Sequence, residues 1–260
     1  MILICSLFLL IFYVYAAFLK AEYLTRKRPV ELLLDKRKRS SDYCPWEKIS
    51  EEVKKYIILI EDPGFYKRNG TSPRHIISRG ISYFLKKDQT IHGSTIPQQL
   101  AKNLYLHFDR TLFRKITELF ICKKIERCLK KEEILTFYLN VIYYGNEIYG
   151  ISKASAYYFQ KKPAELTANQ AVFLACLIAG PNAADPVHYP EKFFSLKKRK
   201  LEKCFREGLI TEKECRFFCS FPVNQPDPEF APAICRTENE PVIHMENKRF
   251  GPFKRGRMSR

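Results

Sequence analysis

A helix start rich in polar side chains occupies residues 92–103, HGSTIPQQLAKN. Ser94 and Thr95 are both of a type that caps helices, and Pro97 suits a first turn. A helix that begins there points unpaired backbone N–H groups and the positive end of its dipole outward, which favours bound phosphate. The stretch therefore predicts an anion-binding helix end.

Three longer side chains follow on the same helix. Lys102 lies seven residues past Thr95, about two turns along, and therefore on the same face. Gln98 and Gln99 offer amides to sugar hydroxyls or to a carbonyl. The alternative is an ordinary capped helix, in which Ser, Thr and Gln satisfy the backbone and solvent.

A second group of cations follows at Arg110, Arg114 and Lys115, and it leads to Glu118. Arg114 and Glu118 are four residues apart, so a helix places them on one face. Taken alone, this spacing predicts an ordinary ion pair that contributes a few tenths of a kcal/mol.

Glu61 lies near the end of the stretch PWEKISEEVKKYIILIED, in which apolar residues recur at helical spacing. The stretch predicts a helix from Pro45 that stops at Asp62-Pro63-Gly64. A glutamate at a helix edge can face a cleft. Together with Glu118 and the cations it makes a site for a sugar phosphate. One carboxylate would act as a base on an alcohol, while lysine, arginine or a metal stabilises a departing diphosphate.

The elements that must position these residues are helices, and no repeat or strand alternation is present. Further helices are expected at residues 76–87, 113–130 and 131–140, after the capping box Thr167-x-x-Gln170, and after the similar Thr211-x-x-Glu214. The pattern predicts one mainly α domain at residues 43–221.

The first twenty residues carry no charge from Ile2 to Leu19, and this helix would be roughly 27 Å long, close to the thickness of a bilayer core. We expect residues 1–20 to be a transmembrane anchor, because a cleaved signal peptide would need a basic start and a cleavage site. Residues 21–42 then form a basic linker, and residues 222–260 a Pro-rich and basic C-terminal tail. The basic residues after the anchor favour a cytoplasmic domain by the positive-inside rule.

The formal net charge is +17, which fits nucleic acid, anionic lipid, a phosphate-bearing substrate or simply a solvated surface. The basic residues are not interleaved with aromatics, and no helix-turn-helix is evident, so we expect no nucleic-acid partner. Nine cysteines without metal-ligand spacing favour scattered thiols over a disulfide framework.

Four segments in order resemble the motifs of the peptidoglycan glycosyltransferases, family 51. They are EDPGF at 61–65, GSTIPQQLAKN at 93–103, RKITE at 114–118 and KKEEILTFYLNVIYYGNEIYGISKASAYYF at 130–159. The run at 166–186, LTANQAVFLACLIAGPNAADP, is similar to the segment that follows them. The resemblance covers about Trp46 to Glu214; each motif is weak alone, and four in register are a strong signal.

The resemblance implies a lysozyme-like helical glycosyltransferase domain that is tethered by an N-terminal transmembrane helix. It implies polymerisation of lipid II into glycan strands at the bacterial cytoplasmic membrane, with release of the undecaprenyl diphosphate carrier. Because no transpeptidase domain fits the remaining residues, the monofunctional form is expected. Family precedent places the domain outside the cytoplasm, and we follow it because long domains translocate largely regardless of flanking charge.

The resemblance also assigns residues. Glu61 matches the catalytic base, and Glu118 matches a second catalytic glutamate thought to hold a divalent metal, magnesium or manganese, or to assist departure of the diphosphate. The positions that match substrate-binding groups are Ser94, Thr95, Gln98, Gln99, Lys102, Arg110, Arg114 and Lys115. Growing glycan strands and cell-wall synthesis proteins are the implied partners.

Three departures from the family pattern stand out. Arg68 replaces a histidine and cannot relay a proton as an imidazole does. His92-Gly93 replaces a Gly-Gly pair, and the family's late paired arginines are matched only loosely by LKKRKL at 196–201. Altered activity is conceivable, and no contact is assigned to the last segment.

Other functions remain open. A lysozyme-like peptidoglycan hydrolase would also use two carboxylates, although it explains neither the clustered cations nor the anchor. A non-catalytic, membrane-tethered cell-wall scaffold would need no working glutamate at position 61.

Overall fold

The structure is a computed structural model that describes residues 2–68, 94–106 and 111–220. Helices form nearly all of the regular structure in these ranges, and an isolated bridge pairs Tyr143 with Tyr149. The helices are α1 (Ile2–Lys27), α2 (Val30–Lys38), η1 (Trp46–Lys48), α3 (Glu51–Glu61), α5 (Ile96–Tyr105), α6 (Leu112–Cys128), α7 (Lys131–Val141), α8 (Ile151–Phe159), η2 (Pro163–Glu165), α9 (Ala168–Ile178), α10 (Pro190–Arg206) and α11 (Glu212–Ser220). The prediction of a mainly α fold is confirmed.

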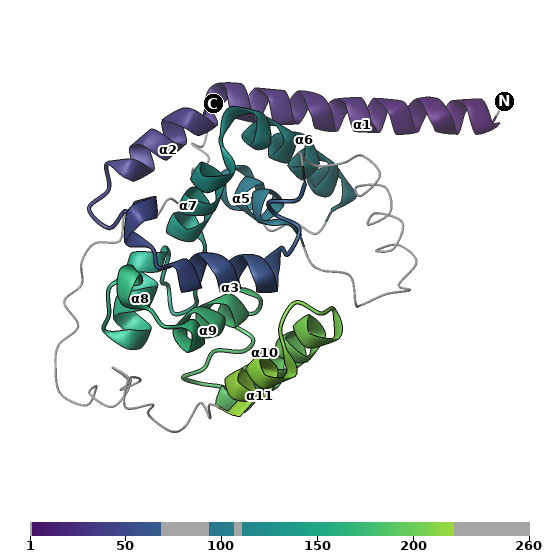
Figure 1. Cartoon of the computed structure of the whole chain (residues 1–260). Coiled ribbons are helices and arrows are strands. Elements are labelled where there is room, and N and C mark those ends of the chain that lie inside the picture. The colour runs from purple at the N-terminus through teal and green to yellow at the C-terminus, as the bar shows by residue number, and fades with distance from the viewer. Residues whose placement is uncertain (1, 69–93, 107–110, 221–260) are drawn as a thin grey trace.

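The core lies where three helix contacts meet: α3 packs on α9, and α5 packs on both α6 and α7 (Figure 1). Ile57, Leu100, Ile121, Tyr138 and Leu174, one from each of these helices, are fully buried in one cluster. Burying a large apolar side chain contributes about 1.5–3 kcal/mol. These contacts hold α5 against α6 and α7. They thereby fix the position of the polar residues at the start of α5.

The helix expected from Pro45 is in fact two elements. Residues 46–48 form a short 3₁₀ turn, Ile49 is extended with φ −103° and ψ 126°, and α3 starts afresh after Ser50. The Ser50 hydroxyl accepts a hydrogen bond from Val53 N at 3.2 Å, which is the usual way in which serine caps a helix. The cap, and not the proline, therefore sets the start of the helix that carries Glu61.

The segment expected to be a basic linker, residues 21–42, differs from that expectation because it is largely helical. The first helix continues to Lys27, and α2 buries Val30 and Leu34 in the core. Arg37 donates from Nε to the carbonyl oxygen of Asn140 at 3.0 Å. Amphipathic packing thus makes α2 part of the domain.

A glycine makes that attachment possible. Gly150 has a φ of +89°, and a Cβ there would lie 2.7 Å from the Asn140 oxygen and 3.1 Å from Arg37 Nη2. Both the backbone conformation and the close approach require a residue without a side chain.

The described part of the chain has one helix long and apolar enough to cross a membrane, Cys5–Lys27. From Tyr13 onward this helix packs on α6: the rings of Tyr13 and Phe113 are 5.4 Å apart, and Phe18 and Phe120 make a similar pair. The N-terminal end of the helix projects beyond the rest of the molecule (Figure 1).

The last two helices, α10 and α11, lie on the side of the molecule opposite α1 (Figure 1). Phe193 of α10 packs on Phe173 of α9 in a tilted arrangement with ring centroids 4.6 Å apart, and Phe218 of α11 meets Tyr56 of α3 edge-on at 5.1 Å. As a result α10 lies against α3. The expected helix at 76–87, Arg110 and the expected tail at 222–260 lie outside the described residues.

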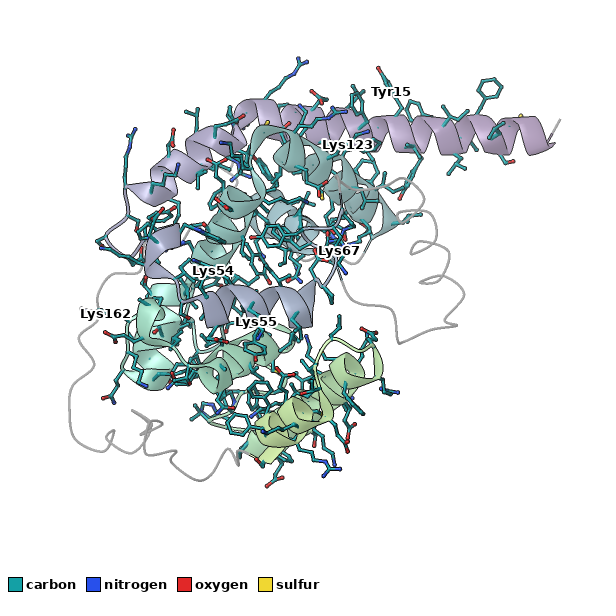
Figure 2. The ribbon with its side chains drawn as sticks, viewed as in Figure 1. Tyr15, Lys54, Lys55, Lys67, Lys123 and Lys162 are labelled. Carbon is teal, nitrogen blue, oxygen red and sulfur yellow. The ribbon has the colours of Figure 1, made fainter. Side chains whose placement is uncertain are left out.

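Lysines are spread over the molecule rather than confined to one element. Figure 2 labels Lys55 on α3, Lys123 on α6 and Lys162 before η2. The cations that matter for chemistry must therefore be identified by their contacts, because net charge alone does not locate them.

Candidate active site

Glu61 is the last residue of α3, and its side chain is only 7% exposed. Both of its carboxylate oxygens are bonded. Lys200 of α10 donates to Oε1, and Gln99 of α5 donates from Nε2 to Oε2 at 2.8 Å. A buried carboxylate stays charged only when it is paired and hydrogen-bonded, and here it has one cation and one amide.

Gln99 is itself held in place. The hydroxyl of Tyr138 donates to its Oε1 at 3.0 Å, and its Nε2 also reaches the carbonyl oxygen of Ser94 at 3.1 Å. Burial, followed by the nearby charge of Glu61, raises the pKa of Tyr138 well above its ordinary value. The phenol therefore remains a hydrogen-bond donor and fixes which way the Gln99 amide points.

The start of α5 forms the expected cap. Gln98 N donates to Thr95 Oγ1 at 3.4 Å, and Thr95 N donates to Gln98 Oε1 at 3.2 Å, which is a capping box. Both residues are buried. The polar atoms of Thr95 and Gln98 that make these bonds thus serve the helix start, although the resemblance assigned them to substrate.

The end of α5 that was predicted to seat phosphate already has a carboxylate. Asp62 accepts from Ile96 N at 3.1 Å through Oδ2, and its Oδ1 pairs with Arg68. A negative side chain at a helix N-terminus satisfies the orphan N–H groups and the dipole. Asp62 therefore ties the end of α3 to the start of α5, and Arg68, which replaces a family histidine, compensates its charge.

The second glutamate lies in α6, which begins after the Thr111 cap. Glu118 is 1% exposed and pairs with Arg114 Nη1 at 2.6 Å and with Lys115 Nζ. Lys115 also donates to the hydroxyl of Ser94 at 2.8 Å. The expected helix-face pair is present, but its burial and its second cation make it more than a surface ion pair.

Lys102 belongs to the same neighbourhood. Burial lowers its pKa; the Glu118 charge opposes that effect, and the cations of Arg114 and Lys115 reinforce it. A lysine amid other cations and partly removed from water is suited to meeting an anionic group, because binding relieves that repulsion.

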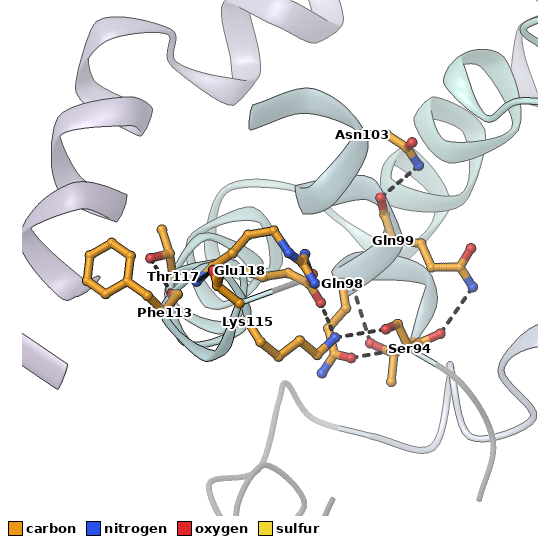
Figure 3. A network of polar contacts seen from close by, with 11 residues as sticks. Ser94, Gln98, Gln99, Asn103, Phe113, Lys115, Thr117 and Glu118 are labelled. Atoms are coloured by element: carbon orange, nitrogen blue, oxygen red, sulfur yellow. Dashed lines mark hydrogen bonds and ion pairs between the residues drawn. The ribbon is translucent and has the colours of Figure 1, made fainter. Parts of the chain in front are cut away.

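One network of polar contacts therefore joins the two glutamates, and Figure 3 shows its part from Gln99 to Glu118. It runs from Lys200 and Glu61 through Gln99 and Ser94 to Lys115 and Glu118. Figure 3 shows Ser94 between Gln99 of α5 and Lys115 of α6. The structure thus brings together Ser94, Gln99, Lys115 and both glutamates, with Arg114 and Lys102 alongside; Arg110 is not among the described residues.

A divalent metal at Glu118 fits these residues poorly. Across residues 2–68, 94–106 and 111–220, no three His, Cys, Asp or Glu side chains converge. Both Glu118 oxygens are already paired with cations. Magnesium and manganese favour sites rich in carboxylate or carbonyl oxygens. The chemistry below is therefore derived from side chains.

Comparison with known proteins decides the family. The family model "Transglycosylase" matches residues 27–204, which is more than half of the chain. The chain belongs to the transglycosylase family. Its domain is accordingly lysozyme-like, and the enzyme class is glycosyltransferase.

Individual relatives agree with this assignment. The transglycosylase is 31% identical over 215 residues to "Monofunctional glycosyltransferase" of Staphylococcus haemolyticus, covering 80% of this chain and 79% of that protein. It is 37% identical to "Penicillin-binding protein 1A" of Aquifex aeolicus and 36% identical to "Penicillin-binding protein 4" of Bacillus subtilis, in each case over 66% of this chain. The chain spans only 24% and 28% of those two penicillin-binding relatives.

Three residues of the transglycosylase site were missed by sequence reasoning: Asp62, Tyr138 and Lys200. Asp62 was quoted in the helix stop and in the EDPGF motif, but it was given no role of its own. Lys200 lies in the run Lys197–Lys200, whose adjacent cations point in all directions around a helix at about 100° per residue. The buried residues Phe193, Leu201 and Cys204 recur at helical spacing and mark the inner face of α10. That spacing could have placed Lys200 only if the helix against which α10 packs had been known.

Proposed function

We propose that this transglycosylase is a peptidoglycan glycosyltransferase that polymerises lipid II, with Glu61 as the general base. The observation that carries the proposal is the network that links a buried carboxylate at position 61 to the cations of α6. A sugar diphosphate needs a base near the attacking hydroxyl and cations near the leaving group. The network supports both ends of that reaction in one site.

At the base end, the 4-hydroxyl of the acceptor sugar attacks the anomeric carbon of the donor and gives its proton to Glu61. Each carboxylate oxygen has room for about two hydrogen bonds, so the contacts from Lys200 and Gln99 leave acceptor positions for that hydroxyl. Glu61 is the last residue of α3, and its side chain is 7% exposed. It is therefore held in place while each oxygen keeps an acceptor position.

At the leaving-group end, the bond between the anomeric carbon and the diphosphate oxygen breaks, and the diphosphate departs with the bonding electrons. Lys115, Arg114 and Lys102 supply positive charge where negative charge develops on the leaving diphosphate. Glu118 holds Arg114 and Lys115 from the same helix and so fixes where the cations point. We therefore assign Glu118 the role of positioning Arg114 and Lys115. The Ser94 hydroxyl lies between the base end and the leaving-group end of the site.

The first helix supports a membrane location. α1 is 26 residues long, so it reaches about 39 Å, more than the roughly 30 Å of a bilayer core. Its side chains Leu19 and Tyr23 are exposed and suited to a membrane environment. A membrane crossing by α1 would bring α6, and the cations it carries, down to the headgroups where a lipid-linked donor lies.

We place the domain on the outer side of the bacterial cytoplasmic membrane, with the growing glycan strand as product and acceptor. Cell-wall synthesis proteins are the expected partners. The basic residues that follow α1 oppose this orientation, but translocation of a long domain is largely insensitive to flanking charge.

The test uses the full-length protein in detergent micelles or liposomes. It is supplied separately with lipid II and with finished, uncross-linked glycan, and product lengths are followed by gel electrophoresis. We expect lipid II to be built into longer chains and finished glycan to be left intact. Shortened glycan would instead identify a hydrolase, and no change in either substrate would favour a scaffold.

A further inference from the structure

Lys200 is the charged partner of Glu61 within the described part of the chain, and it comes from a distant element. It lies 139 residues from Glu61 and donates its ammonium to Oε1, the oxygen that Gln99 does not hold. The Lys200 side chain is 22% exposed, and that of Glu61 is 7% exposed. The contact is therefore largely removed from water, where a charge pair is stronger than at the surface.

The rest of α10 fixes where Lys200 points. Phe193, Leu201 and Cys204 are buried along the inner face of this helix, and Phe193 packs on Phe173 of α9. Lysine has a flexible stem, but its backbone here belongs to a packed helix. The ammonium can reach Glu61 because α10 lies against α3.

A neighbouring lysine does not share this role. Lys197 is one turn earlier and buried, and burial lowers its pKa, with the nearby thiols of Cys176 and Cys219 having the opposite effect. Lys198, two residues before Lys200, points outward and pairs weakly with Glu202 at 4.0 Å. Of these three, the ion pair with Glu61 belongs to Lys200.

We infer that Lys200 is a positioning residue for Glu61 in the proposed glycosyl transfer. Its ammonium donates to Oε1, and this bond complements the Gln99 bond to Oε2. Two bonds from opposite elements fix the plane of the carboxylate. The remaining acceptor positions are thereby aimed at the incoming hydroxyl. The inference rests on the proposed function.

The test compares three variants of the full-length protein in the lipid II polymerisation assay. Lys200→Met keeps the length of the side chain and removes its charge, whereas Lys200→Arg keeps the charge. Lys198→Met is the matched control, because it removes an exposed lysine from the same helix. Values of kcat and KM are measured across pH 5–9, and thermal unfolding is recorded for each variant.

We expect Lys200→Met to lower kcat by about 10²-fold, the cost of a slightly misplaced catalytic group, while KM changes little. We expect this loss of kcat throughout pH 5–9, because the misplaced carboxylate no longer meets the incoming hydroxyl. Lys200→Arg should recover most of kcat, because arginine keeps the charge and the donor. Lys198→Met should match the wild type.

Two failures are distinguishable. A wild-type protein that does not polymerise lipid II overturns the proposed function, and the role of Lys200 with it. A wild type that polymerises lipid II beside a Lys200→Met variant with unchanged kcat across pH 5–9 overturns the role of Lys200 alone, as does an equal loss in Lys198→Met. If Lys200→Met does not fold, Lys200→Gln, which keeps a donor without the charge, takes its place in the same comparison.

Discussion

Glu61 and Glu118 are both buried glutamates with bonded oxygens, yet their partners come from different places. Glu118 pairs with Arg114 and Lys115, which lie four and three residues before it, respectively, on the same helix. Glu61 bonds Gln99 and Lys200, which lie 38 and 139 residues away on two other helices. One environment is local in sequence, and the other exists only when three helices have packed.

This difference suggests a division of labour. Glu118 faces two cations and has both oxygens paired with them, so it is suited to holding those cations in place. Glu61 is held by one cation and one neutral amide, so each of its oxygens keeps an acceptor position for a hydroxyl. The same residue type thus serves the two ends of one hydrogen-bonded network.

The largest expected effect is the loss of catalysis when Glu61, the proposed base, is replaced. Glu61→Gln should lower polymerisation of lipid II by about 10²- to 10⁴-fold, the typical loss for a positioned base, while lipid II binding is retained. Turnover is measured by chain growth, and binding by retention of labelled lipid II. Glu51→Gln, which alters an exposed glutamate of the same helix, is the control. Equal turnover by the Glu61→Gln variant and the wild type would remove the base from the mechanism.

The next largest effect is on the free energy of unfolding, which should differ between variants of Glu118 and Glu61. Glu118→Gln should lower the free energy of unfolding by about 3 kcal/mol, because it leaves two cations facing each other across a buried site. The loss should exceed that of Glu61→Gln, where one cation remains. Urea denaturation of the detergent-solubilised protein measures both variants, and Glu202→Gln, at an exposed position, serves as the reference. If Glu118→Gln cost no more than Glu202→Gln, the supporting role would be wrong.

A smaller effect depends on pH. The lowered pKa of Lys102 means that this ammonium loses its proton at a lower pH than an ordinary lysine. Affinity for a lipid diphosphate should therefore weaken by about tenfold as pH rises toward 10.5, through loss of one charge-assisted hydrogen bond.

The measurement is titration of the wild type and Lys102→Arg with undecaprenyl diphosphate at pH 7.5 and pH 9.5. Arginine stays charged throughout this range, so the variant should keep its affinity at the higher pH. A parallel decline in both proteins would mean that another group is responsible.

The smallest effect concerns metal. Because Glu118 is occupied by Arg114 and Lys115, we expect chain growth to be nearly unchanged when a chelator removes divalent ions. A metal that stabilised the leaving diphosphate would be worth several kcal/mol, so its removal would lower turnover by orders of magnitude. Polymerisation is compared with and without chelator, and then after magnesium or manganese is returned. Strong loss followed by recovery would restore the metal role implied by the family.

Some elements of the fold could be predicted because their signals are local. The cap at Thr95, the stop after Glu61 and the box at Thr211 with Glu214 all depend on residues within four positions of one another. Other elements were missed because local signals compete. Pro45 and Ser50 both suit a helix start; the structure selects Ser50, which caps Val53 N and whose own N donates to the distant Pro163 O. Charge made residues 21–42 look like a linker, although Val30 and Leu34 pack in the core.

The sequence by itself determined the helical character, the motifs that resemble the family and the pairing of Arg114 with Glu118. Helix geometry alone brings residues four apart into contact. Only the tertiary structure decided that Lys200 meets Glu61 and that the Asp62 carboxylate caps α5. Those contacts depend on how α3, α5 and α10 pack, and packing is set by many buried apolar side chains acting together across the whole chain.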